Sequence, residues 1–295
     1  MFALLPPPVL GCMSLAVLTL NTIFWCSLLF AVALLRRAIP MQAWRDGCSR
    51  ILHTIGQSWI ACNSLGLVWT KKIHWDVEGT DGLRRNAWYL VVANHQTWVD
   101  IVVLQKIFYG KIPMLKFFLK QELIWVPFLG IAWWALDFPF MKRSSSVRKD
   151  FDTTRKACER FKAVPVSVMN FVEGTRYTKA KHEQQESPHK NLLRPKAAGI
   201  ALVLESMGEQ IQSILDVTII YPQGPQDIWT FLCSKSMEVK VIVKQLPVTK
   251  EIIGDYLENR IFRKTFNNWL DSLWKEKDQL LESSIHTSNI SAMKG

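Results

Sequence analysis

The sequence predicts an α/β protein in which a mostly parallel sheet is flanked by helices and follows an N-terminal membrane-associated helical segment. Two observations support this fold class. The first 35 residues hold no charged side chain, and Val9–Leu35 exceeds the roughly 20 apolar residues that cross a bilayer. After Lys72, short apolar runs alternate with stretches of helical periodicity, which is typical of a parallel sheet with helices on its faces.

The N-terminal segment, residues 1–72, is expected to anchor the protein to a membrane. Its apolar run is too long for a cleaved signal peptide and lacks basic residues before it. Basic residues outnumber acidic ones directly after the run, which predicts a cytoplasmic location for its downstream end. These residues are Arg36, Arg37, Arg45 and Arg50, against Asp46.

A second uncharged stretch, Ile51–Thr70, has mixed polarity because it contains His53, Gln57 and Asn63. This composition favours a helix that lies in or dips into one leaflet over a second membrane span. An ordinary buried helix of the following domain fits the same residues, so the sequence leaves that alternative open.

The α/β domain is expected at residues 73–250, followed by a C-terminal segment at 251–295. A long amphipathic helix is expected from Glu251 to about Glu282, with Ser283–Gly295 as a loose tail. The expected strands are Ile73–Val77, Tyr89–Ala93, Phe138–Met141, Val166–Val172, Val217–Tyr221 and Val239–Leu246, and the expected helices lie near Thr97–Phe108, Val147–Phe161 and Ala197–Met207.

Composition limits the classes of partner. The 36 basic and 25 acidic residues give a net charge of +11, which favours a membrane surface, a phosphorylated substrate or nucleic acid. The 13 tryptophans favour the membrane interface among these. The six cysteines show no CxxC spacing, so we expect reduced, mostly packed cysteines and neither a zinc site nor a disulfide framework.

The segment Asn94–Asp100 directly follows the expected strand Tyr89–Ala93 and contains a histidine five residues before an aspartate. Positions five apart on a helix point about 140° away from each other. His95 and Asp100 therefore meet only if His95 lies in the turn before the helix and Asp100 lies in its first turns. In that arrangement Asp100 fixes the imidazole tautomer, and His95 acts as a general base on a hydroxyl.

A second polar turn, Glu173–Arg176, follows the strand Val166–Val172. Gly174 lets the backbone approach a ligand closely, Thr175 offers a hydroxyl, and Arg176 presents a planar fork that suits phosphate. Glu173 is expected to hold Arg176 or a neighbouring arginine. The alternative is a glycine turn with a surface Glu–Arg pair.

A third strand end brings Lys142 and Arg143 to the same expected edge of the sheet, after Phe138–Met141. Open α/β sheets place their ligands beyond the carboxyl ends of strands. Together, the three strand ends describe a pocket for a phosphate ester that bears a hydroxyl. Beside a membrane anchor, this ligand is expected to be a lysophospholipid.

The uncharged stretch Leu123–Trp134 contains three tryptophans. It fits either a buried helix or an apolar wall that meets lipid or an acyl chain.

The motifs resemble the four sequence blocks of the PlsC-type glycerolipid acyltransferases. The blocks appear in the family's order over roughly Trp75 to Pro222, and their combination is highly specific. They are His95-x4-Asp100, Phe140-x-x-Arg143, Glu173-Gly174-Thr175-Arg176 and Tyr221-Pro222. The wider sequence is similar to a bacterial membrane member of that family, which implies a bacterial inner membrane with the catalytic domain on the cytoplasmic side.

The resemblance implies a role for each matching residue. His95 is the implied general base and Asp100 its partner. The implied acceptor phosphate site consists of Arg143, Glu173, Gly174, Thr175 and Arg176. Pro222 is implied to shape the acyl-donor side, and Lys196 and Gly199 resemble a further lysine–glycine element. The second block departs from the family's usual glycine–phenylalanine arrangement, so only Arg143 transfers from it.

The implied reaction is direct acyl transfer from a thioester of coenzyme A or acyl carrier protein to the hydroxyl of a lysophospholipid, most simply 1-acyl-glycerol-3-phosphate. It needs no protein nucleophile, metal or bound cofactor. Backbone N–H groups near Asn94–Thr97 are the expected oxyanion donors. The alternatives are a membrane-attached nucleic-acid-binding or nuclease protein, which the aromatic distribution and the lack of a carboxylate cluster disfavour, and a catalytically silent scaffold of the same fold.

Overall fold

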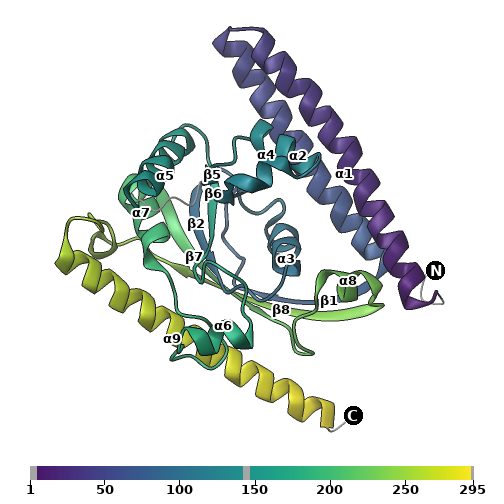
Figure 1. Ribbon diagram of the computed structural model, residues 1–295, viewed down its shortest axis with the longest axis vertical. Coiled ribbons are helices and arrows are strands. Elements are labelled where there is room, and N and C mark those ends of the chain that lie inside the picture. Colours follow the sequence, from purple (N-terminus) through teal and green to yellow (C-terminus); the bar gives the residue numbers. More distant parts are fainter. Residues whose placement is uncertain (1–4, 142–146, 294–295) are drawn as a thin grey trace.

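The computed structural model describes residues 5–141 and 147–293, and it shows a sheet between two layers of helices with a helical hairpin along one side (Figure 1). The first half contains α1 (Pro7–Ala38), α2 (Gln42–Thr70), β1 (Lys72–Glu78), β2 (Trp88–Ala93), α3 (Val99–Phe108), β3 (Leu115–Phe117), β4 (Leu119–Lys120), η2 (Gln121–Trp125), α4 (Leu129–Ala135) and β5 (Phe140–Met141). The second half contains α5 (Val147–Phe161), β6 (Ser167–Phe171), α6 (Lys179–Gln184), α7 (Ala197–Met207), β7 (Ile211–Ile220), α8 (Ile228–Cys233), β8 (Ser236–Leu246), η3 (Lys250–Ile252) and α9 (Arg260–Met293).

The main sheet has six strands in the order β1-β8-β7-β2-β6-β3. Its neighbouring strands are parallel except for the antiparallel pair β7–β8. Ala93 at the end of β2 pairs with Phe171 of β6 and with Val217 of β7. The carboxyl ends of these three central strands therefore lie at one edge of the sheet, which is where such sheets place their sites. The predicted α/β class is confirmed.

Helices cover both faces of the sheet (Figure 1), and two apolar cores hold them there. One core joins a face of the sheet to α5, α7 and α9, with Trp274 of α9 fully buried in it. The other joins the opposite face to α3, α8 and the end of α2. The central strands β2 and β7 are buried on both faces, which explains their nearly continuous apolar sequence.

The first two helices form an antiparallel hairpin whose polar side chains pair with each other. Asn21 donates to Asn63 across the helices at 2.8 Å, and Trp59 donates to Thr22 at 3.2 Å. These contacts satisfy polar groups that would be costly to leave unpaired beside lipid. Among the described residues, α1 is the helix long and apolar enough to cross a membrane. The helix predicted over Ile51–Thr70 exists but begins earlier, at Gln42.

Several structural details differ from the sequence-based expectations. Phe140–Met141 pairs with β4 in a separate two-stranded sheet, while β3, too short to be noticed, joins the main sheet. Helix α9 begins at Arg260 and continues through Met293, so the loose tail from Ser283 is wrong over that range. The expected start at Glu251 was wrong because Glu251 lies in a separate short turn, η3, which precedes α9.

The stretch Leu123–Trp134 is not one buried helix. A turn at Phe128, whose φ is +62°, separates η2 from α4. Trp125 is 84% exposed, and Phe128, Ile131 and Trp134 are also exposed. The exposed side chains exclude the single buried helix, and an apolar wall that meets lipid or an acyl chain stays a prediction.

Candidate active site

The loop between β2 and α3 brings His95 and Asp100 together at the predicted sheet edge. His95 lies before the helix and Asp100 in its first turn, and His95 Nδ1 is 2.8 Å from Asp100 Oδ2. The His95 side chain is 12% exposed, whereas the Asp100 side chain is fully buried. Because the carboxylate only accepts hydrogen bonds, it keeps the proton on Nδ1 and leaves the Nε2 lone pair for a substrate.

Asp100 is held by donors from three directions. Its Oδ2 atom also accepts from the backbone N–H groups of Gln96, at 2.6 Å, and Thr97, at 2.9 Å. The Tyr221 hydroxyl donates to Oδ1 at 2.6 Å. Burial, with the nearby Asp100 charge, raises the pKa of Tyr221 well above its ordinary value, so the phenol stays a donor. The carboxylate is thereby fixed before substrate arrives.

These contacts change the expected oxyanion site. The N–H groups of Gln96 and Thr97 already donate to Asp100, and that of His95 donates to Glu173. The three amides are therefore committed to carboxylates and do not serve as free donors. These three amides do not match the expectation of free oxyanion donors, because the two buried acids accept their hydrogen bonds. The expectation for the N–H group of Asn94 stays a prediction.

Glu173 is completely buried and holds two segments of backbone. Its Oε1 atom accepts from His95 N at 3.1 Å, and its Oε2 atom accepts from Leu193 N at 3.0 Å. Burial raises the pKa of Glu173 to about 7, against the opposing effect of these two hydrogen bonds. This placement differs from the expected role in phosphate binding: the carboxylate positions the His95 loop, and no contact with Arg176 is formed.

The rest of the Glu173–Arg176 turn lies at the surface beside the His95–Asp100 pair. Gly174 has φ +68°, and a Cβ there would lie 3.2 Å from Lys196 Cδ, so the turn requires glycine. Thr175 Oγ1 accepts from Lys181 Nζ at 2.8 Å. The Arg176 guanidinium lies 4.8 Å from the centre of the Trp98 ring. Arg176 and the neighbouring Lys181 and Lys196 therefore bring three positive charges to this turn.

Two other predicted residues have different outcomes. Arg143 lies outside the described residues. Pro222 is half-buried in the turn after β7, which the hydrogen bond from Gly224 N to Tyr221 O closes at 2.9 Å. It thus follows directly on Tyr221, the donor to Asp100. Its role on the acyl-donor side stays a prediction.

Sequence reasoning missed several residues that shape the site. Phe171 stacks on the His95 imidazole with ring centres 3.8 Å apart and planes 12° apart. The buried Asn94 side chain donates to the C=O of Ile219 at 2.9 Å and accepts from its N–H at 2.8 Å. Tyr221 carried a detectable signal, since it belongs to the fourth block. Phe171 carried none, because an aromatic residue at a strand end usually belongs to the core.

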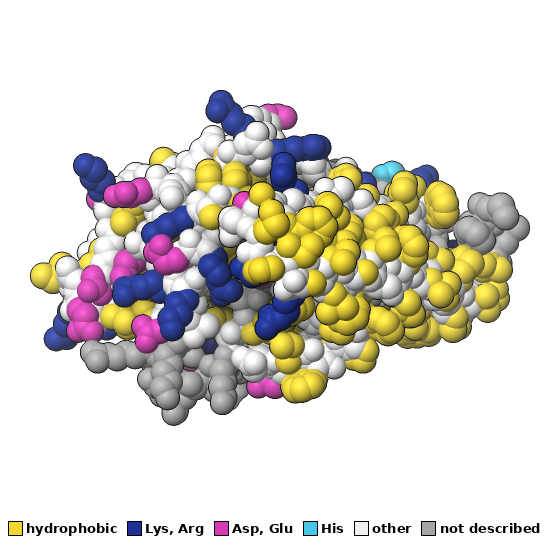
Figure 2. Space-filling model, turned by 90° about the horizontal axis from the view of Figure 1, so that it is seen from above, with side chains coloured by type: hydrophobic (Ala, Val, Ile, Leu, Met, Phe, Trp, Pro, Cys, Tyr) yellow, Lys and Arg dark blue, Asp and Glu magenta, His cyan; other side chains and the backbone are white. Residues whose placement is uncertain are grey.

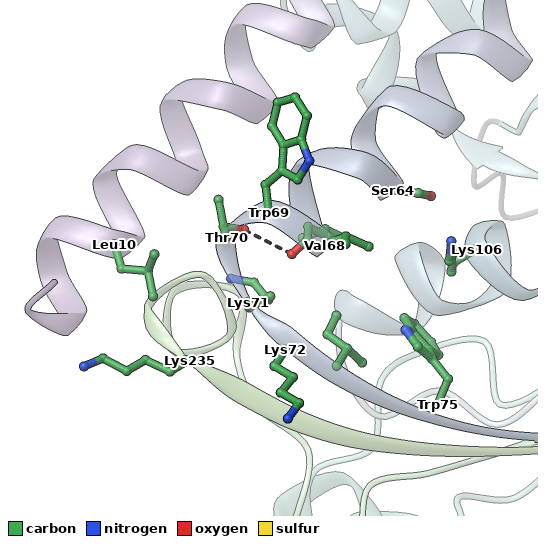
Figure 3. Close-up of a pocket in the computed structure, with 12 residues that line it drawn as sticks. Leu10, Ser64, Val68, Trp69, Thr70, Lys71, Lys72, Trp75, Lys106 and Lys235 are labelled. Atoms are coloured by element: carbon green, nitrogen blue, oxygen red, sulfur yellow. Dashed lines mark hydrogen bonds between the residues drawn. The ribbon is translucent and has the colours of Figure 1, made fainter. Parts of the chain in front are cut away.

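A cavity of about 430 Å³ lies away from these residues, between α2, β1 and α3 (Figure 3). Trp69 and Trp75 contribute to its lining, together with lysines including Lys72 and Lys106. None of the predicted site residues lines this cavity. Among the described residues, no cluster of three or more His, Cys, Asp or Glu side chains is suited to hold a metal ion.

The sequence and the fold are similar to those of known proteins. Residues 74–222 match the model of the Acyltransferase family. The chain is 26% identical to 1-acyl-sn-glycerol-3-phosphate acyltransferase gamma of Mus musculus over 208 residues, covering 65% of this chain and 52% of that protein. It is 25% identical to 1-acyl-sn-glycerol-3-phosphate acyltransferase delta of Homo sapiens over 211 residues, covering 67% of this chain and 53% of that protein.

A solved structure supports the fold. It is the crystal structure of the 1-acyl-sn-glycerophosphate acyltransferase PlsC from Thermotoga maritima, with a TM-score of 0.52, 17% identity, and coverage of 90% of this chain and 95% of that one. The chain spans about half the length of the mouse and human relatives. Because the family model covers half of the sequence, including the His95–Asp100 pair and the Glu173–Arg176 turn, the chain belongs to the Acyltransferase family.

Proposed function

We propose that the protein is a membrane-bound acyltransferase that moves a fatty acyl group from an acyl thioester to the free hydroxyl of a lysophospholipid. The preferred acceptor is 1-acyl-glycerol-3-phosphate, and the product is phosphatidic acid. The observation that carries this proposal is the preorganised His95–Asp100 pair at the sheet edge. The names of the mouse and human relatives support the choice of acceptor. The thioester carrier is coenzyme A or acyl carrier protein.

In the proposed reaction His95 acts on the acceptor hydroxyl. Its Nε2 atom takes the proton while the acceptor oxygen attacks the thioester carbonyl carbon. The new C–O bond forms, the C–S bond breaks, and the leaving thiolate takes the proton back from His95. Asp100 stabilises the imidazolium between these steps, and acid–base catalysis of this kind contributes typically 10²–10⁴-fold in rate.

The cations around the Glu173–Arg176 turn support recognition of the acceptor phosphate. Arg176 is exposed while stacked on Trp98, so its forked donors remain available to a ligand. The Lys196 side chain lies next to Gly174, where the missing Cβ lets a phosphate approach the backbone. An anion bound here would lie beside the catalytic loop and orient the hydroxyl for attack.

We propose further that α1 and α2 lie in the plane of one leaflet of a bacterial inner membrane, with the catalytic domain on the cytoplasmic side. Both ends of α1 contact the domain: Gly11 faces Cys233 and Trp229 near its start, and Arg36 pairs with Asp137 at 3.0 Å near its end. The 32-residue helix is about 48 Å long. Because both ends of α1 contact the polar domain, this helix cannot run across the bilayer and lies parallel to its surface.

A direct assay tests the proposal. Purified protein is incubated with labelled acyl-CoA or acyl carrier protein and a panel of lysophospholipids, and mass spectrometry identifies the products. We expect phosphatidic acid from 1-acyl-glycerol-3-phosphate, and His95→Ala should lower the rate by about 10²–10⁴-fold. His74→Ala removes an exposed histidine from β1 and serves as the matched control. Full activity of His95→Ala would refute the base assignment.

A further inference from the structure

A second cavity, of about 350 Å³, lies where the end of α1, the start of α2 and the end of α4 meet. Arg36, Arg37 and Arg45 line it from the hairpin, and Trp134 and Asp137 line it from the other side. None of these residues belongs to the catalytic loop or to the Glu173–Arg176 turn. The cavity is therefore a separate basic feature of the hairpin tip.

The charges in this cavity do not balance. Arg36 Nη1 donates to Asp137 Oδ2 at 3.0 Å, which uses the one carboxylate among the described lining residues. The Arg37 and Arg45 guanidinium groups make no ion pair within the described part of the chain. Two guanidinium groups beside a small cavity favour an anion with several oxygens, because each group presents a planar fork of N–H donors.

The surroundings indicate where that anion comes from. Figure 2 shows hydrophobic side chains gathered over the hairpin, with Lys and Arg side chains along the border of this surface. Leu35, Met41, Trp44 and Trp134 are all exposed near the hairpin tip. The Trp44 indole donates to Leu35 O at 2.9 Å, which fixes the turn between the helices. Exposed tryptophan and leucine next to arginine are typical of the headgroup level of a bilayer.

We propose that this cavity binds the phosphate headgroup of an anionic membrane phospholipid, at a site distinct from the acceptor site. Arg37 and Arg45 hold the phosphate oxygens, Trp134 packs against the glycerol and first acyl carbons, and the acyl chains enter the leaflet along the hairpin. The bound lipid fixes the hairpin tip at the membrane surface. The proposal rests on membrane association but not on acyl transfer.

Vesicle binding without substrates tests the site. The probes are phosphatidylcholine vesicles with and without phosphatidylglycerol, at constant ionic strength, and the measured quantity is the ratio of the two partition coefficients. Arg45→Gln should lower this preference roughly tenfold or more, as expected for loss of a charge-assisted contact with the phosphate. Arg50→Gln is the matched control, since Arg50 is exposed on the same helix but does not line the cavity. It should lower the preference by at most about fivefold, the contribution of one basic residue to the general attraction of an anionic surface.

Each outcome decides the question. Selective loss in Arg45→Gln, with unchanged thermal unfolding, supports the site. Equal loss in both variants, or no loss in either, overturns it in favour of a diffuse positive field. If inorganic phosphate, equimolar with the phosphatidylglycerol, releases the protein from the vesicles, the cavity binds a free anion instead of a lipid headgroup. If the protein binds an acidic carrier protein and Arg45→Gln abolishes that binding, the occupant of the cavity is the carrier protein and not a lipid. Since no acyl donor is present, failure here leaves the proposed reaction untouched.

Discussion

Replacement of Glu173 by Gln should change how the stability of the protein depends on pH. Burial raises the pKa of this carboxyl from 4.5 to about 7 in the folded protein. The folded state therefore holds the proton more tightly than the unfolded state. The stability that protonated Glu173 contributes is fully present below pH 4.5 and is lost as the pH rises through about 7. At about 1.36 kcal/mol for each pKa unit, the loss is roughly 3 kcal/mol.

Glu173→Gln removes this titration but also removes one of two acceptors. A Gln side chain offers one oxygen, so either His95 N or Leu193 N loses its partner and faces an NH₂ group. An unsatisfied buried donor costs about 1–3 kcal/mol. The variant should therefore be less stable than the parent at pH 4.5 and should gain roughly 3 kcal/mol relative to it by pH 8. Because residue 173 no longer bridges the His95 loop and Leu193, kcat should also fall, by roughly 10- to 100-fold.

Urea unfolding at a series of pH values measures the free energy of unfolding of both proteins. Effects of other titrating groups cancel in the difference between them. Glu183→Gln removes a carboxylate from the exposed side of α6 and controls for the change in net charge. A difference between Glu173→Gln and the parent that stays constant from pH 4.5 to pH 8 would show that the folded state does not hold Glu173 as described.

The remaining predictions concern residues around the site and the buried ion pair between α9 and β7. Tyr221→Phe removes the 2.6 Å hydrogen bond to the buried Asp100 carboxylate; kcat should fall about tenfold with KM little changed, and steady-state kinetics that show only a KM effect would contradict this. Arg176→Gln should raise KM for 1-acyl-glycerol-3-phosphate about tenfold or more while leaving acyl-thioester KM unchanged, as expected for loss of a charge-assisted contact worth about 1.5–3 kcal/mol; equal effects on both substrates would argue against acceptor recognition. Lys277→Met leaves the buried Asp216, 2.6 Å from Lys277 Nζ, without its partner; unfolding should become easier by about 3–5 kcal/mol, and the double variant with Asp216→Val should recover most of it. An unchanged denaturation midpoint in the single variant would mean that this α9–β7 pair does not stabilise the fold.

The local part of the site could be predicted from the sequence. His95 and Asp100 lie in one loop and one helical turn, so their meeting depends on short-range geometry that the strand end and the helix start already specify. The same holds for Gly174, whose turn follows directly on a strand. Roles that came with the family resemblance, such as phosphate binding by Arg176, stay predictions that the proposed kinetics test.

Contacts between distant segments could not be predicted in this way. Glu173 and His95 are 78 residues apart, and Tyr221 and Asp100 are 121 residues apart. Whether they meet depends on strand order and register, and a strand's apolar pattern is the same for several orders. Burial is also a property of the whole fold. Because the fold buries Glu173, its carboxylate accepts hydrogen bonds from backbone N–H groups and does not take the expected place in the phosphate site.

The sequence by itself determined the strand-and-helix alternation, the apolar N-terminal segment and the position of the His95–Asp100 pair, because these follow from periodicity and from spacing within a few residues. Only the tertiary structure decided that β3 joins the main sheet, that Phe171 stacks on His95, and that the arginines of the hairpin tip share a cavity with Trp134 of α4. The physical reason is that side chains far apart along the chain interact only after the helices pack, and the packing energy is shared among all of them.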